Sequence, residues 1–268
     1  MYKGFEVKLE SRMFMLRDCK IVRYPDIFTN HREYNAMAES ARNNLEKQKA
    51  QVKRRLYDYV RNDGVIDGGM VSEDWFPEID ADVFLSHSHA DERLVLAFAG
   101  WLEANFGIGA FIDSCVWGYA DDLLKELDNI YCYQSSSRTY NYSKRNRTTA
   151  FVHNLLASAL TKMMDKCECL MFVNTPNSIS GSPEQNETSS PWIYYELAQS
   201  QVLRSHYKRV HMFTKGGVMD SLNESFRVAL PARTSHLTKL NNAALGQWLD
   251  DWQRGIADIP LDLLYSYK

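Results

Sequence analysis

Hydrophobic and polar positions follow two recurring patterns from residue 82 to residue 254. Short apolar runs are typical of buried strands, and longer segments with apolar residues three and four positions apart are typical of amphipathic helices. The predicted strands cover residues 82–86, 109–113, 169–174, 209–214 and 234–237. The predicted helices cover residues 92–106, 119–133 and 151–166, a segment that begins at Pro191, and residues 222–230 and 241–254. This alternation predicts an α/β fold: a five-stranded parallel sheet in flavodoxin-like order with helices on both faces.

The first 78 residues follow a different pattern and are expected to form an N-terminal extension of an α/β domain at residues 79–268. Residues 1–30 are irregular in pattern, whereas residues 31–62 lack Gly and Pro and show helical spacing of apolar side chains. The stripe of this long amphipathic helix consists of Tyr34, Met37, Ala38, Ala41, Leu45, Val52, Leu56, Tyr59 and Val60. It must be buried against the same chain or against a second copy in a coiled coil. Packing within the protomer is favoured, because Gln48 and the small alanines weaken a long zipper.

Composition and charge narrow the class of protein. The 268 residues include 31 Lys and Arg against 34 Asp and Glu, so a net charge of -3 gives no reason to expect nucleic acid or membrane as a partner. Five cysteines, few and odd in number, are typical of a reduced intracellular protein. Cys167 and Cys169 open an apolar run, so strand packing is favoured over zinc binding. With no secretory signal and no apolar run of about 20 residues, we expect a soluble, cytoplasmic protein.

The densest positive charge lies in residues 134–149, a polar segment rich in Ser, Arg and Tyr. This composition predicts a loop, and a solvated loop is the favoured interpretation. Contact with phosphate or with a partner surface is the alternative.

Ser190 and Pro191 mark the start of a helix, since serine caps helices and proline suits the first helical position. Trp192 and Glu196 lie four residues apart and therefore share one face of this helix. In a flavodoxin-like sheet, ligands bind at the carboxyl ends of the first and third strands, where the winding direction switches. The third strand leads into this helix, so we expect Glu196 at that crevice. An ordinary surface glutamate is the alternative.

Three segments resemble the Toll/interleukin-1 receptor (TIR) domain family. Residues 82–91 (DVFLSHSHAD) are similar to the family's first strand and loop, and residues 109–113 to its second strand. Trp192-x-x-x-Glu196, after Ser190 and Pro191, resembles the Trp-x-x-x-Glu motif of its third helix. The resemblance covers residues 80–255. Residues 114–119 lack the Pro-Gly pair common in receptor and adaptor members, and residues 134–166 form an insertion.

The resemblance implies an activity. Many TIR proteins cleave NAD⁺ at the nicotinamide–ribose bond, and some cyclise or conjugate the ADP-ribose into a signal, as in anti-phage systems such as Thoeris. Their catalytic residue corresponds to Glu196, and the aromatic residue of the nicotinamide pocket corresponds to Trp192. The partners implied are NAD⁺, other TIR protomers in a homo-oligomer formed on activation, and a separate effector protein that responds to the product.

Further candidates for contact with the substrate lie at the ends of the first two strands: Phe84, His87, Ser88, Asp113 and Trp117. Each has a structural alternative, which is an ordinary loop residue for the first three, helix capping for Asp113 and local packing for Trp117. His87, His89 and Asp91 alternate on a loop with no fourth ligand in sight, so no metal is expected. No Gly-rich phosphate loop or Gly-x-Ser-x-Gly elbow occurs, so NAD⁺ is expected as a consumed substrate and not as a resident cofactor.

These observations favour an NAD⁺ glycohydrolase, ADP-ribosyl cyclase or transferase. A non-catalytic TIR scaffold, acting through TIR–TIR assembly, is the alternative from another class. A different nucleotide-processing enzyme on the same scaffold is a third, because a fold does not fix a function.

Overall fold

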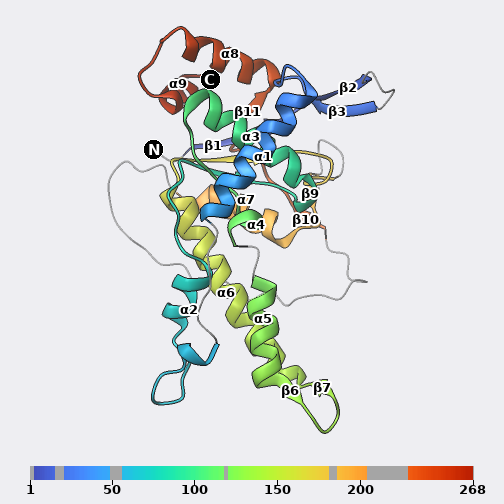
Figure 1. The fold of residues 1–268 in the computed structure, drawn as a ribbon, viewed down its shortest axis with the longest axis vertical. Coiled ribbons are helices and arrows are strands. Elements are labelled where there is room, and N and C mark those ends of the chain that lie inside the picture. Colours follow the sequence, from blue (N-terminus) through green and yellow to red (C-terminus); the bar gives the residue numbers. More distant parts are fainter. Residues whose placement is uncertain are drawn as a thin grey trace.

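The computed structural model describes residues 3–15, 21–48, 56–117, 120–180, 186–203 and 229–267. Its centre is a five-stranded sheet of parallel neighbours in the order β11-β1-β8-β4-β5 (Figure 1). The strands are β1 (Lys3–Lys8), β4 (Val83–Ser86), β5 (Ala110–Phe111), β8 (Cys169–Val173) and β11 (Thr238–Asn241). The predicted α/β fold with a five-stranded parallel sheet is confirmed. Strand β4 lies between β5 and β8, which is compatible with a flavodoxin-like order.

The strand β1 comes from the segment that was expected to be irregular, and that prediction is wrong. Residues 3–8 alternate apolar and polar side chains, yet the strand lies inside the sheet, between β8 and β11. Phe5 and Val7 are fully buried, and Glu6 is buried as well. The division at residue 79 stays a prediction, although the sheet takes one strand from the N-terminal side of it. The chain continues into an antiparallel hairpin of β2 (Ser11–Met15) and β3 (Ile21–Pro25).

The last predicted strand is displaced along the chain. Residues 234–237 form a turn, in which the backbone N–H of Leu237 donates to the carbonyl of Thr234 over 2.9 Å, and β11 follows it. The predicted strand at residues 209–214 and nearly all of the predicted helix at residues 222–230 lie outside the described residues.

The helices mostly agree with the predicted pattern. They are α1 (His31–Gln48), α2 (Gly68–Trp75), α3 (Glu92–Phe106), α4 (Asp113–Val116), α5 (Ala120–Leu127), α6 (Tyr142–Lys166), α7 (Pro191–Val202), α8 (Asn242–Gln253) and α9 (Pro260–Ser266). Short 3₁₀ turns η1 (Leu56–Tyr59) and η2 (His89–Asp91) and a π-helical turn η3 (Asp128–Cys132) complete the described set. Helix α3 has the predicted bounds and ends at Gly107, whose φ of 68° is left-handed and suits glycine.

The loop predicted at residues 134–149 is largely wrong. Strands β6 (Tyr133–Gln134) and β7 (Thr139–Tyr140) form a short hairpin, and α6 already begins at Tyr142. Asn141 caps this helix, because its side-chain oxygen accepts from the backbone N–H of Lys144 over 3.0 Å. The polar first turns of α6 carry no apolar stripe, which is why the pattern did not indicate a helix there.

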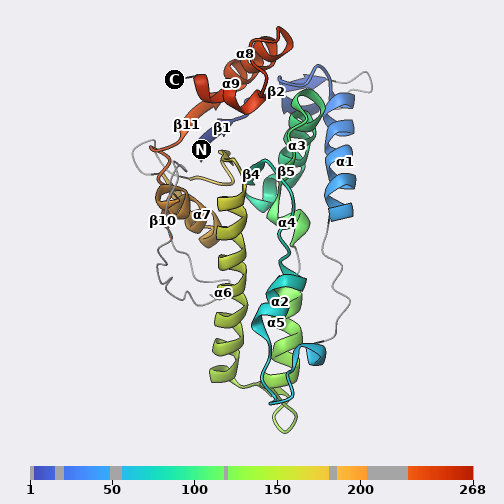
Figure 2. The ribbon, with the colours of Figure 1, turned by 90° about the vertical axis from the view of Figure 1, so that its left-hand side faces the viewer.

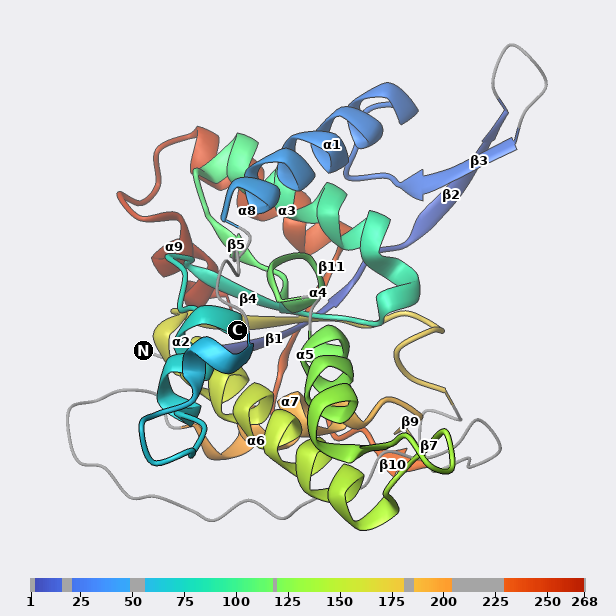
Figure 3. The same ribbon diagram turned by 60° about the horizontal axis from the view of Figure 1, so that its bottom comes forward.

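Helices cover both faces of the sheet, as predicted. Helices α1, α3 and α8 lie on one side, and α6 and α7 on the other (Figure 3). Helix α1 packs on α3 within the protomer, as favoured from its sequence, and Asn44 Nδ2 donates to Glu103 Oε1 over 2.9 Å between them. Of the helix predicted at residues 31–62, α1 covers the part up to Gln48, residues 49–55 lie outside the described residues, and residues 56–59 form the turn η1 instead.

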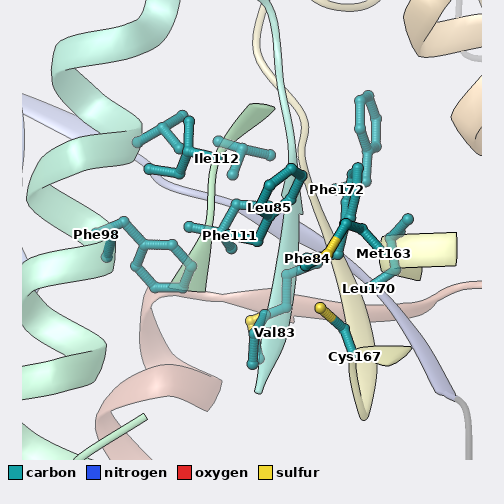
Figure 4. Packing of buried hydrophobic residues seen from close by; sticks show 14 of the residues in the cluster. Val83, Phe84, Leu85, Phe98, Phe111, Ile112, Met163, Cys167, Leu170 and Phe172 are labelled. Atoms are coloured by element: carbon teal, nitrogen blue, oxygen red, sulfur yellow. The ribbon is translucent and has the colours of Figure 1, made fainter. Parts of the chain in front are cut away.

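The core fills the space between the sheet and its two helical layers (Figure 4). Phe84 of β4 and Phe111 of β5 lie with ring centroids 5.2 Å apart, with Phe98 of α3 on one side and Met163 of α6 on the other. Burial of side chains of this size stabilises the fold by about 1.5–3 kcal/mol each. Cys167 and Cys169 are buried here, as the strand-packing interpretation expected, and burial raises the pKa of the Cys167 thiol to about 12.

One part of the molecule projects away from the sheet. Helix α5, the turn η3, the β6–β7 hairpin and the first half of α6 form an antiparallel arm, and α2 lies beside it (Figures 1 and 2). We call residues 120–148 the arm. Within the part of the chain that the structure describes, no helix combines the length and apolar character needed to cross a membrane.

Two helical glycines test the α1–α3 packing. A Cβ at Gly100 of α3 would overlap the backbone carbonyl of Met37 in α1, whereas a Cβ at Gly246 of α8 would meet nothing within 4 Å. We expect Gly100→Ala to lower the free energy of unfolding by about 1–3 kcal/mol, because backbone must move. Gly246→Ala should raise it by about 0.5–1 kcal/mol through helix propensity. Urea denaturation of both variants measures this, and equal effects of the same sign would contradict the close contact.

Candidate active site

The helix that carries Glu196 begins as its sequence predicts. Ser190 caps α7, since its Oγ accepts from the backbone N–H of Ile193 over 3.2 Å, and Pro191 occupies the first turn. Strand β8 precedes this helix, and the described part of the connection contains β9 (Glu187–Thr188), which pairs with β10 (Leu230–Pro231). The helix turns Glu196 inward, where the residue is only 3% exposed.

Glu196 is held by the end of a neighbouring strand. Ser86, the last residue of β4, donates from Oγ to Glu196 Oε2 over 2.5 Å. Ser86 is buried and pairs with Phe172 of β8, so this hydrogen bond lies at the carboxyl ends of β4 and β8. The chain winds from β4 outward to β5 and then returns to β8 on the other side of β4, which makes this the switch point of the sheet. Glu196 therefore lies at the predicted switch point but in the buried interior, and its place in a ligand crevice stays a prediction.

The surroundings of Glu196 favour its protonated form. Burial raises the pKa of this carboxyl well above its ordinary value of 4.5, and the carboxylate of Asp113 raises it further. The hydrogen bond from Ser86 acts in the opposite direction, because it stabilises the charged form. A perturbed carboxyl beside a second carboxyl at a switch point is typical of a functional site.

A small cavity of about 130 Å³ lies between the arm and α7. It is lined by His89, Asp113, Ser114, Trp117, Ala120, Asp121, Leu124, Val152, His153, Leu156 and Trp192. Trp192 is half-buried, and its ring meets that of His153 edge-on with centroids 5.7 Å apart. Glu196 does not line the cavity in this state.

Two larger hollows, of about 530 and 430 Å³, lie elsewhere. The first adjoins the C-terminal end of α7, near Ser200 and His236, and the second adjoins the start of α8, near Asn241. Neither is lined by a buried carboxyl group, and neither lies at the switch point, so size alone does not identify the site.

The structure brings three of the predicted substrate-binding residues to the cavity. Asp113, Trp117 and Trp192 all line it. Trp117 is only 3% exposed, its Nε1 donates to the carbonyl of Pro77 over 3.1 Å, and its ring meets that of Phe111 at 4.7 Å. The packing role that its sequence allowed is therefore also present.

The three candidates from the end of the first strand differ in where the structure places them relative to the cavity. Phe84 is fully buried between the sheet and its helices, where its ring packs on Phe111, so it lies in the core and its role as a substrate contact stays a prediction. Its place in an apolar run was a signal for the core. His87 is buried beside the cavity, with Nε2 3.3 Å from Ser114 Oγ, and Nδ1 lies 3.2 Å from the carbonyl of Leu85. Ser88 is half-buried, precedes η2 and does not line the cavity.

Sequence reasoning missed several residues that line the cavity. His153 of α6 faces Trp192, and Asp121 of α5 also lines the cavity. His153 falls between Val152 and Leu156 on the inner side of its helix, and that spacing was the available signal. Asp91 has a different role from ligation, since Oδ2 accepts from Thr175 Oγ1 over 2.5 Å and joins the loops after β4 and β8.

The burial of Glu196 predicts a pH-dependent stability. The proton is held more tightly in the folded than in the unfolded chain, so stability is full below the ordinary pKa of 4.5 and is lost as the pH rises through the folded pKa. Each pH unit in that window costs about 1.4 kcal/mol. Glu196→Gln, whose amide cannot ionise, should lack this loss and melt above the wild type at alkaline pH.

Thermal melts from pH 4 to pH 9 (about one pH unit apart) measure the difference, with Glu39→Gln on the exposed face of α1 as the matched control. If the melting temperatures of wild type and Glu196→Gln differ by the same amount at every pH in this range, the pKa of Glu196 is not raised.

Comparison of the chain with protein-family models, with curated proteins and with solved structures found no match.

Proposed function

We propose that this chain is a TIR-like enzyme that cleaves the bond between nicotinamide and ribose in NAD⁺, with Glu196 as its catalytic residue. The observation that carries the proposal is the buried hydrogen bond between Ser86 and Glu196. The sequence segments that resemble the TIR family's first strand and third helix meet in this bond. Together with Trp192 and Asp113 at the adjoining cavity, it supports a single site built from these segments.

The chemistry requires one well-placed carboxylate. Nicotinamide leaves NAD⁺ as a neutral molecule, so the leaving group needs no proton. Positive charge develops on the ribose as the bond to its anomeric carbon breaks, and an ionised Glu196 stabilises that charge. Attack by water on the same carbon gives ADP-ribose and releases one proton. In a cyclase or transferase, a nucleophile of the same or another molecule replaces water.

Substrate binding requires an open form of the site. The cavity of about 130 Å³ is smaller than the roughly 300 Å³ of typical ligand pockets, and Glu196 lies outside its lining. We place the opening at Trp192, because its half-buried side chain lines the cavity from the first turn of α7, one turn before Glu196. Widening there would bring the ribose to Glu196 and the nicotinamide ring to the indole. A neighbouring protomer is the proposed trigger, and a separate effector in the cytoplasm is the proposed reader of the product.

A non-catalytic TIR scaffold is the second candidate. The observation that favours it is the 3% exposure of Glu196, since a carboxyl that never meets the cavity serves only to link α7 to β4. The two proposals differ in whether the carboxylate is required for a reaction, and one assay separates them.

We expect purified protein to release free nicotinamide from NAD⁺ and Glu196→Gln to reduce that rate by about 10²–10³-fold, because the electrostatic partner of the transition state is lost. Glu39→Gln, remote on α1, should keep the full rate. Chromatography of the products measures nicotinamide and identifies the nucleotide formed. Absence of release from the wild type, over a range of protein concentrations that includes its assembled form, would favour the scaffold.

The pH profile gives an independent prediction. Because the ionised carboxyl is the active form, kcat/KM should rise with pH through the raised pKa of Glu196. The charge of Asp113 contributes to that raised pKa, so Asp113→Asn should move the inflection to lower pH. Initial rates in a series of buffers measure both profiles. If the inflection of the Asp113→Asn profile stays in place or moves to higher pH, ionisation of Glu196 does not control kcat/KM.

A further inference from the structure

The tip of the arm is an exposed aromatic and cationic surface. Its apolar part consists of Ile130, Tyr131, Tyr133, Tyr140 and Tyr142, and its cations are Arg138, Lys144 and Arg147. We call these eight residues the arm tip. Tyr142 is 76% exposed and Ile130 is 58% exposed, so neither side chain is part of the core of the sheet. Tyrosine and arginine together on an exposed surface are typical of protein interfaces.

The arm tip is held in shape from within. The buried carboxylate of Asp128 accepts from Arg145 Nε over 2.8 Å and from Thr148 Oγ1 over 2.5 Å, which fixes η3 against α6. Tyr140 donates from its hydroxyl to Asn129 Oδ1 over 2.6 Å, and its ring meets that of Tyr133 edge-on at 5.5 Å. Tyr133 and Tyr140 are therefore held in place before any partner binds, which lowers the entropy cost of association.

The arm tip has a counterpart of opposite charge on the same chain. From residue 129 to residue 164 the sequence contains no Asp or Glu, whereas residues 56–82 contain eight acidic residues and one basic residue. We call residues 56–82 the acidic segment, and it includes α2, which lies beside α6 (Figure 1). Glu73 and Glu78 are exposed, and neither has an ion-pair partner among the residues that the structure describes.

We propose that the arm tip binds the acidic segment of a second copy of this chain. Two arms lying antiparallel about a twofold axis would place each tip on the other's acidic segment, which gives a closed, isologous dimer. Opposite charges would orient the encounter, and the exposed tyrosines would supply the buried contact. Nucleic acid fits less well, because the acidic segment beside the arm repels phosphates. This inference is independent of the proposed enzymatic activity.

Sedimentation equilibrium of the full chain tests the dimer. We expect a dimer at about 0.01 M salt, where charges act over roughly 30 Å, and a clearly weaker one at about 1 M, where they act over roughly 3 Å. Tyr142→Ala should weaken dimerisation about 10- to 30-fold, as loss of an interface anchor does. Ile259→Ala is the matched control and should have no effect, because this exposed apolar residue directly precedes α9, which lies at the opposite end of the molecule from the arm (Figure 1).

Charge reversal identifies the two surfaces. Arg138→Glu/Lys144→Glu and Glu73→Lys/Glu78→Lys should each abolish the homodimer, with circular dichroism confirming that both variants fold. Mixed in equal amounts, the two variants should form a heterodimer through the acidic tip of one and the basic segment of the other. A wild type that stays monomeric at low salt, or a mixture that stays monomeric, would overturn the proposal. Binding of a labelled single-stranded oligonucleotide that depends on Tyr142, with no dimer, would assign the arm tip to nucleic acid instead.

Discussion

A carboxyl group removed from water is the constraint around which this molecule is organised. Ionised carboxylates are costly to bury, so a buried Glu196 either keeps its proton or needs compensation from its neighbours. Ser86 supplies one hydrogen bond, whereas Asp113 adds a second negative group instead of a cation. Such an arrangement does little for stability, and under the proposed function its physical sense lies in a positive charge that is present only during the reaction. The structure of β4, β8 and α7 is what keeps this group in place.

Much of the candidate site was predictable, because its signals are local. A serine cap and a proline fix the start of α7, and a spacing of four residues fixes the shared face of Trp192 and Glu196. The parallel pairing of β4 with β8 then brings Ser86 to Glu196 across 110 residues of sequence. Contacts of this kind follow from topology once strands and helices alternate. His153 was harder to foresee, since its position depends on how far α6 extends along the cavity.

The failures at β1 and at the start of α6 share a physical cause, which is that structure was inferred from side-chain polarity alone. The strand β1 was missed because Glu6 interrupts its apolar residues. Glu6 is nevertheless buried, with Oε1 accepting from Asn174 Nδ2 over 2.5 Å. The first turns of α6 were missed because their stability comes from a cap and from Asp128, and not from an apolar stripe. Tertiary contacts that compensate a polar residue leave no periodic trace in the sequence.

The place of β1 has a consequence for how the chain is made. Lys3 pairs with Cys169, and Phe5 pairs with Thr238, so β1 is synthesised well before the two strands that flank it in the sheet. Pairings of such long sequence separation close large loops and form slowly. Until β11 has been synthesised, Phe5 and Val7 lack one of the two neighbouring strands that bury them, so their burial is a late step in the folding of this sheet.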